Sequence, residues 1–131
     1  MSILAALAAI SYLGSVNDCS KGTSLFKLTS MSLTPDPPVK GQNSTLRLSM
    51  NVPSDVTGGT VTYSVTYNFI PLAPTVEDLC LTVACPIATG TLDTVSSVPI
   101  DPSLSGSLSL KIDWKDTSNA ELMCVSINVK V

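Results

Sequence analysis

Apolar and polar residues alternate along much of this chain with a period of two, the period of a β-strand. The alternation is clearest in GTVTYSVTYNFI, residues 59–70. Because successive side chains of a strand point to opposite faces, this segment predicts a strand with one buried face. The residues expected on that face are Val61, Tyr63, Val65, Tyr67 and Phe69.

Three further segments repeat the pattern: TLRLSMNV (45–52), GSLSLKIDW (106–114) and ELMCVSINVKV (121–131). In the last of them Cys124 has the opposite parity to its apolar neighbours, so we expect it on the outer face of the sheet. An early strand over 25–33 changes parity between Leu28 and Met31, and a β-bulge would reconcile the two halves. The predicted inward residues are Leu46, Leu48, Met50, Val52, Leu108, Leu110, Ile112, Trp114, Met123, Val125, Ile127, Val129 and Val131.

The connecting segments are short and rich in proline, glycine and aspartate, as turns require. Six or seven short strands without a predicted helix indicate an all-β fold. A two-layer, immunoglobulin-like antiparallel sandwich fits this spacing best, and a closed barrel is the alternative. At 131 residues the chain has the length of one domain.

The first residues, MSILAALAAISYLGS, hold an apolar run of signal-peptide length that is too short to span a membrane. We therefore expect a cleaved signal over residues 1–16 and a single domain over 17–131. A buried first strand or a retained anchor is the alternative, although the alanine-rich run lacks the residues that strands prefer. In a secreted chain, Asn43 in NST is a candidate glycosylation site.

Composition excludes several classes of function. Charged residues make up 13 % of the chain and its net charge is −3, so no basic surface for nucleic acid is expected. The chain has no histidine, which removes the residue most used as a general base and as a zinc ligand. Four aspartates could in principle supply a carboxylate pair, but no nucleophile or base accompanies them. We expect no enzyme, no cofactor and no metal; the aspartates are Asp93, Asp101, Asp113 and Asp116.

The four cysteines admit three disulfide pairings. The short spacing of Cys80 and Cys85 favours a local bond, which leaves Cys19 to reach Cys124. A zinc site would need two close cysteine pairs, and a redox pair would have a narrower spacing at the start of a helix. We therefore expect two structural disulfides.

The order of these pieces is similar to that of the lipid-recognition (ML) domain family. The resemblance rests on Cys19 after the predicted signal, PDPPVKGQNSTL, the spacing of Cys80 and Cys85 before PIATG, and the cysteine of the closing strand. It is greatest to the phosphatidylglycerol/phosphatidylinositol transfer proteins and the Niemann-Pick type C sterol-transfer proteins. Many sterol-transfer members carry six cysteines, and this chain has four.

The resemblance implies a sandwich whose sheets part to hold a lipid in a hydrophobic cavity between them. On alternation alone, a filled core is the favoured interpretation, and the resemblance reverses that preference. The residues expected to line the cavity and bind lipid are Tyr63, Val65, Tyr67, Phe69, Leu108, Leu110, Ile112, Met123, Val125 and Ile127. Apolar residues of the connecting loops could frame the cavity mouth and touch a membrane, or merely cover the ends of the sandwich: Ile70, Leu72, Ile100 and Leu104.

The function that the resemblance implies is a soluble, monomeric lipid-binding and lipid-transfer protein that is secreted or resides in the endolysosomal lumen. Its partners would be a phospholipid or a sterol and, transiently, a membrane surface. The alternative is a secreted immunoglobulin-like adhesion module that binds protein and no lipid.

Overall fold

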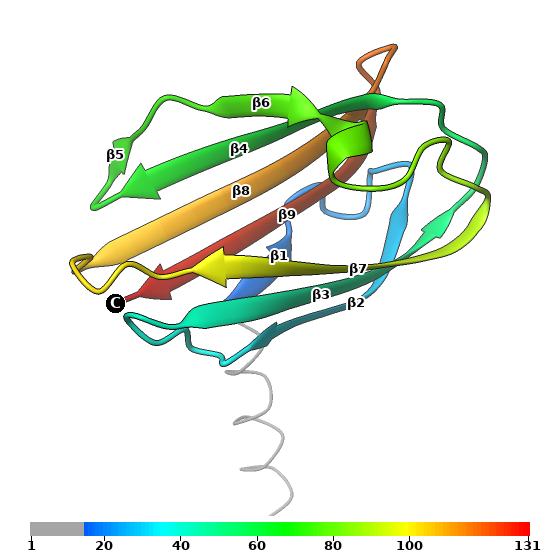
Figure 1. Cartoon of the computed structure of the whole chain (residues 1–131). Coiled ribbons are helices and arrows are strands. Elements are labelled where there is room, and N and C mark those ends of the chain that lie inside the picture. The colour runs from blue at the N-terminus through cyan, green and yellow to red at the C-terminus, as the bar shows by residue number, and fades with distance from the viewer. Residues whose placement is uncertain (1–14) are drawn as a thin grey trace, which may run out of the picture.

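The computed structural model describes residues 15–131, which form nine strands and one short 3-10 helix (Figure 1). Residues 1–14, and with them most of the predicted signal, lie outside the described residues. The elements are Val16–Asp18 (β1), Lys27–Thr34 (β2), Asn43–Val52 (β3), Gly59–Tyr67 (β4), Ile70–Pro71 (β5), Thr75–Asp78 (β6), Leu79–Leu81 (η1), Gly90–Pro99 (β7), Ser107–Asp116 (β8) and Glu121–Lys130 (β9).

The strands form two separate antiparallel sheets. A six-stranded sheet has the order β1-β9-β8-β4-β5, and β6 also pairs with β4. A three-stranded sheet has the order β2-β3-β7. Figure 1 shows the two sheets as layers, with β7 at the edge of the smaller one. The chain is therefore an immunoglobulin-like β-sandwich, as predicted, and not a closed barrel.

The alternation of the sequence sets which side chains enter the core. In β3 every second residue is buried, and β8 and β9 contribute Ile112, Trp114 and Val125 from the opposite sheet. Burying aliphatic side chains from both layers is the main force that holds such a sandwich together. The expected bulge in the early strand is confirmed, since the register of β2 against β3 shifts between Leu28 and Ser30.

The prediction that the fourth strand continues inward through Phe69 is wrong. β4 ends at Tyr67, and Asn68 and Phe69 have φ of 48° and 67°, in the left-handed region. Two successive left-handed residues make a tight hairpin turn, so the next residue returns along the sheet edge as β5. As a result the Phe69 side chain is 86 % exposed.

Both disulfides have the expected pairing. Cys19 is bonded to Cys124 with a Cα–Cα distance of 5.1 Å, and Cys80 is bonded to Cys85 at 5.4 Å. Cys124 does lie on the outer face of β9, but its exposed fraction is only 1 %. Its sulfur is bonded to Cys19, and residues 19–26 run along the edge of β9, where Phe26 N–H donates to the Leu122 carbonyl at 2.8 Å.

The described chain begins inside the predicted signal. Val16, the last residue of that predicted segment, is buried in β1 opposite Ile127. The position of signal cleavage stays a prediction. Among residues 15–131, no helix has the length and hydropathy that a membrane span requires.

Candidate functional site

A cavity of about 150 Å³ lies between the two sheets. Side chains of both layers line it, and no acidic or basic side chain of the described residues is among them. Such a cavity favours an apolar ligand that needs no charged partner. The lining residues are Leu46 and Leu48 of β3, Tyr63 of β4, Thr82 after η1, Thr94, Ser96, Ser97, Val98 and Pro99 of β7, Leu110, Ile112 and Trp114 of β8, and Met123 of β9.

The apolar walls come from the central strands of the two sheets. Leu46 and Leu48 occupy alternate positions of β3, and Leu110 and Ile112 occupy alternate positions of β8. Strand periodicity therefore directs each pair to the same face. Tyr63 stands directly opposite Ile112 in the register of β4 and β8 and widens the same wall.

The polar part of the lining is confined to one side of the cavity. Thr94 and Ser96 are alternate residues of β7, opposite Leu48 and Leu46 of β3, and Ser97 and Thr82 complete the set. β7 is an edge strand of its sheet. The hydroxyl groups thus lie toward an edge of the sandwich, while the apolar walls lie deeper.

The size of the cavity limits what it holds in this conformation. An apolar cavity of about 150 Å³ can accept a molecule the size of benzene, whereas pockets for larger ligands measure about 300 to 1,000 Å³. A lipid chain of a dozen or more carbons would therefore require the sheets to move apart. Strand β7 is suited to such a movement because its only pairing partner among the described strands is β3.

The structure brings four of the ten predicted lipid-binding residues together around the cavity: Tyr63, Leu110, Ile112 and Met123. Val125 and Ile127 are buried in the core and do not line it. Val65, Tyr67 and Leu108 are half-buried toward the far end of β4 and β8, where the Tyr67 hydroxyl donates to the Ser105 carbonyl at 2.9 Å. Phe69 lies on the surface in the turn after β4, so its assignment to the cavity is wrong.

Sequence reasoning missed the contribution of β7. Its cavity-lining residues include Thr94, which is half-buried, and Ser96, which is exposed, and hydroxyl-bearing residues at such positions hide the alternation of a strand. The sequence signal that remained was the spacing of Leu92 and Val98, which places both on the same face of a strand. Both are half-buried against the core. Leu46, Leu48 and Trp114 were predicted to point inward but were not assigned to the cavity.

The apolar loop residues divide into two groups. Ile100 is 3 % exposed and Leu104 is half-buried, so these two cover an end of the sandwich. Ile70 and Leu72 are 63 % and 51 % exposed and lie beside the β4–β5 turn. Asn43, the candidate glycosylation site, is exposed at the start of β3, and its modification stays a prediction.

A pair of carboxyl groups, Asp113 and Glu121, lies on the face of β8 and β9 that points away from the cavity. Their oxygens and the Cys124 sulfur lie within 4.8 Å of one another, but that sulfur is bonded to Cys19 and is not free to bind a metal. Burial, a hydrogen bond with Asp113 and the Asp113 charge raise the pKa of Glu121 to about 7. Asp113 Oδ1 and Glu121 Oε2 are both shielded from water and have no other hydrogen-bond partner, and a proton on Glu121 would supply the donor these oxygens lack.

The other aspartates considered as catalytic candidates accept hydrogen bonds within turns or between strands. Asp101 accepts from Ser103, Asp116 accepts from the backbone of Ser118 and Ala120, and Asp93 accepts from Ser49. The turn contacts are ordinary ones for aspartate and stabilise local backbone.

Comparison with known proteins identifies relatives over nearly the whole chain. A Dictyostelium discoideum protein whose assigned name is that of a phosphatidylglycerol/phosphatidylinositol transfer protein is 31 % identical over 131 residues, which cover 96 % of this chain and 92 % of that protein. The phosphatidylglycerol/phosphatidylinositol transfer protein of Pyricularia oryzae is 29 % identical over 113 residues, covering 81 % of this chain and 64 % of its own length. Both relatives are named as transfer proteins, not as enzymes.

Solved structures share the fold at lower sequence identity. A Niemann-Pick type C2 protein from the Japanese carpenter ant superimposes with a TM-score of 0.67 at 15 % identity, covering 87 % of this chain and 96 % of its own. Chicken MD-1, solved in complex with lipid IVa, gives a TM-score of 0.65 at 13 % identity, with 88 % and 86 % covered. The sequence profile of the ML domain matches residues 14–131. The chain is therefore a member of the ML domain family.

Proposed function

We propose that this protein binds a phospholipid between its two sheets and transfers it between membranes. The single observation that carries the proposal is the cavity, whose deep walls are aliphatic and whose edge bears hydroxyl groups. Acyl chains would contact Leu48, Leu110 and Ile112, and the ester and headgroup region would lie near Thr94 and Ser96. Each buried methylene contributes about 0.8 kcal/mol, so a single acyl chain supplies enough apolar area for useful affinity.

A phospholipid fits the cavity better than a sterol does. The space of about 150 Å³ is narrow, and a flexible acyl chain can enter as the sheets separate, whereas a rigid ring system needs the full width at once. The relatives named as phosphatidylglycerol/phosphatidylinositol transfer proteins support this choice of headgroup class.

The proposal also includes the compartment in which the protein acts. A predicted signal over residues 1–16, two disulfides and a candidate glycosylation site at Asn43 all suit the secretory route. Delivery outside the cell or in the endolysosomal lumen follows from that route, and a single copy of the chain would hold the lipid.

A transfer assay tests the function. Donor vesicles carry self-quenched fluorescent phosphatidylglycerol, and acceptor vesicles carry none. We expect the protein to accelerate dequenching in proportion to its concentration, and to act more slowly on a fluorescent sterol presented in the same way. A rate equal to spontaneous exchange with both probes would contradict the proposal and favour an adhesion module.

A further inference from the structure

The turn that joins β4 to β5 exposes a large aromatic side chain in an unfavourable backbone conformation. Phe69 has φ of 67° and is 86 % exposed. Bulky residues rarely adopt left-handed backbone, and glycine is the usual residue at this position of a hairpin turn. The fold therefore accepts strain at Phe69 and gains little burial from it, and such outliers often mark a functional contact.

The turn is held in place by the loop before β8. Asn68 N–H donates to the Ser107 carbonyl at 2.8 Å, and its side chain bridges the same loop. Asn68 Nδ2 donates to the Ser105 carbonyl at 3.0 Å, and Asn68 Oδ1 accepts from Ser107 N–H at 2.9 Å. These bonds present Phe69 from a fixed backbone, so a partner that contacts it loses little conformational freedom in the turn.

Other exposed apolar side chains lie beside Phe69. Ile70 is 63 % exposed and Leu72 is 51 % exposed. We call these two residues and Phe69 the Phe69 tip. Single exposed apolar residues are common on proteins, but three within four positions concentrate exposed apolar side chains at this turn.

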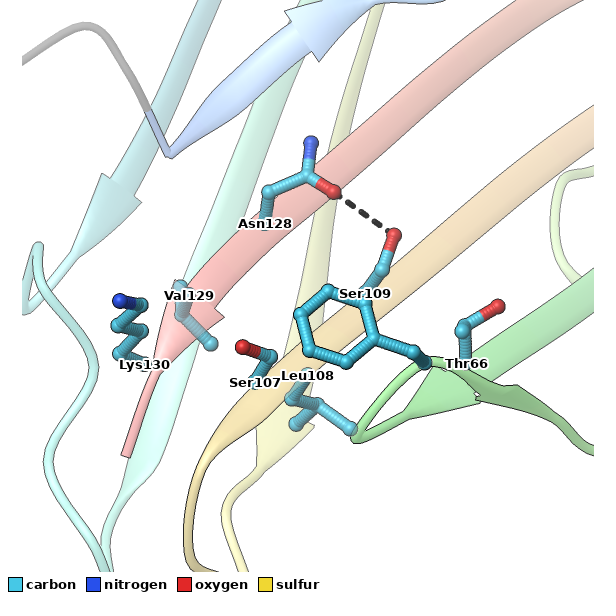
Figure 2. A pocket seen from close by; sticks show the side chains of 8 residues that line it. Thr66, Ser107, Leu108, Ser109, Asn128, Val129 and Lys130 are labelled. Carbon is cyan, nitrogen blue, oxygen red and sulfur yellow. Dashed lines mark hydrogen bonds between the residues drawn. The ribbon is translucent and has the colours of Figure 1, made fainter.

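The surface next to the tip is suited to lipid headgroups. Phe69 borders a groove of about 460 Å³ whose other lining residues include Leu108, Val129 and Lys130. Figure 2 shows the labelled polar side chains of this groove, including Asn128, which accepts from Ser109 at 2.7 Å. Among the described residues that line it, none is acidic and Lys130 supplies a positive charge, although the chain as a whole carries a net charge of −3. Anionic headgroups are therefore not repelled here.

We propose that the Phe69 tip is a membrane-docking element that inserts into the headgroup region of a phospholipid bilayer. The inference rests on the proposed transfer function, because a protein that exchanges lipid must contact the bilayer surface. Aromatic side chains prefer that interface, where the ring is shielded from water.

The tip fits a bilayer better than it fits a protein strand. β5 is two residues long, and Pro71 within it and Pro74 after it have no N–H to donate, so β5 offers a partner chain no regular strand edge to pair with. Docking would also bring the cavity close to the membrane, because Tyr63 of the cavity wall lies on the same strand, about 13 Å from the end of β4.

The variant Phe69→Gly removes the exposed ring and so tests membrane docking without destabilising the fold. Glycine adopts the left-handed conformation without strain, so we expect the variant to be at least as stable as the natural chain. Val95→Ser is the matched control, since Val95 is 62 % exposed on β7 and removing it deletes apolar surface elsewhere. The full chain and both variants are floated with vesicles of phosphatidylcholine and phosphatidylglycerol, and their uptake of micelle-free dihexanoyl phosphatidylglycerol is measured separately.

We expect Phe69→Gly to weaken vesicle binding about tenfold, the loss that follows from no longer burying one aromatic side chain. Val95→Ser should bind vesicles as the natural chain does, and uptake of the dihexanoyl lipid should be unchanged in both variants. Equal vesicle binding by the natural chain and Phe69→Gly would overturn the proposal. No vesicle binding by the natural chain would also overturn it, and so would a dimer of the natural chain that Phe69→Gly abolishes. Failure of the proposed lipid binding itself would appear as no uptake of the dihexanoyl lipid, whatever the vesicles show.

Discussion

Leu48 of β3 and Ile112 of β8 line one cavity from opposite sheets. The two strands are far apart in sequence and belong to different layers, so the cavity exists only once the sandwich is assembled. Widening it requires separation of the sheets, whereas filling it requires one larger side chain. These two properties make the proposed lipid site testable by substitution.

Filling the cavity should block lipid without harming the fold. Val98→Phe adds a ring on the half-buried, cavity-lining face of β7, and we expect it to lower phospholipid uptake about tenfold, equivalent to displacing about two methylene groups. Val95→Phe is the matched control, because Val95 lies on the same strand with its side chain exposed. Equal uptake by the two variants, measured on folded protein, would place the lipid elsewhere.

Stability should fall as the pH rises through neutrality. The pKa of Glu121 is raised to about 7 in the fold from 4.5 in the unfolded chain, so the folded state binds the proton more tightly between those values. The associated stability is complete below pH 4.5 and is lost as the pH passes 7. After allowance for solvent screening we expect a loss of about 1 kcal/mol, or about 4 °C in Tm.

Glu121→Gln identifies the source of this pH dependence. The variant cannot lose a proton, so its Tm should change less between pH 5 and pH 8 than that of the natural chain. Asp55 and Asp101 have lowered pKa values because Thr89 and Ser103 donate hydrogen bonds to them, and their titration lies below this range. An identical pH dependence in both proteins would exclude Glu121 as its cause.

The long-range disulfide should contribute more stability than the local one. The bond between Cys19 and Cys124 spans 105 positions, and the bond between Cys80 and Cys85 spans 5. In the chain-entropy model, removing the first costs about 4 to 5 kcal/mol and removing the second costs about 2 kcal/mol. Urea unfolding of the two double alanine variants measures the difference, and the reverse order would show that strain or residual structure in the unfolded chain dominates.

Two adjacent glycines should differ in how much stability they lose on substitution by alanine. A Cβ at Gly59 would collide with the backbone carbonyl of Lys115 on the neighbouring strand, which cannot give way without disturbing the β4–β8 pairing. A Cβ at Gly58 would meet Cys80 Sγ at 3.7 Å, an ordinary contact. We expect Gly59→Ala to lower the free energy of unfolding by about 2 kcal/mol and Gly58→Ala to leave it within about 0.5 kcal/mol, both measured by urea unfolding. Equal effects would mean that β8 adjusts to the added methyl group.

The sequence predicted the fold well because its strongest strands alternate regularly. β3, β8 and β9 carry aliphatic residues at every second position, and the parity change around Leu28 correctly indicated a bulge. The end of β4 was not predictable in this way. Phe69 has the parity of an inward residue, but Asn68 turns the chain first, and asparagine without a following glycine is a weak turn signal.

The cavity itself could be predicted only in part. Alternation shows which side chains point inward, so Tyr63, Leu110, Ile112 and Met123 were identified. It does not show where packing is incomplete, which depends on how side chains of opposite layers meet. For this reason Val125 and Ile127, which fill the core, could not be told apart from the residues that border open space.

The most direct test of the account is the native mass of the protein produced in eukaryotic cells. The natural chain is purified without detergent and its native mass spectrum is recorded, together with a lipid extract of the same sample. The account predicts a discrete added mass that matches a phospholipid and is reduced in Val98→Phe but not in Val95→Phe. A bare protein mass that stays unchanged after incubation with phospholipid vesicles would contradict it.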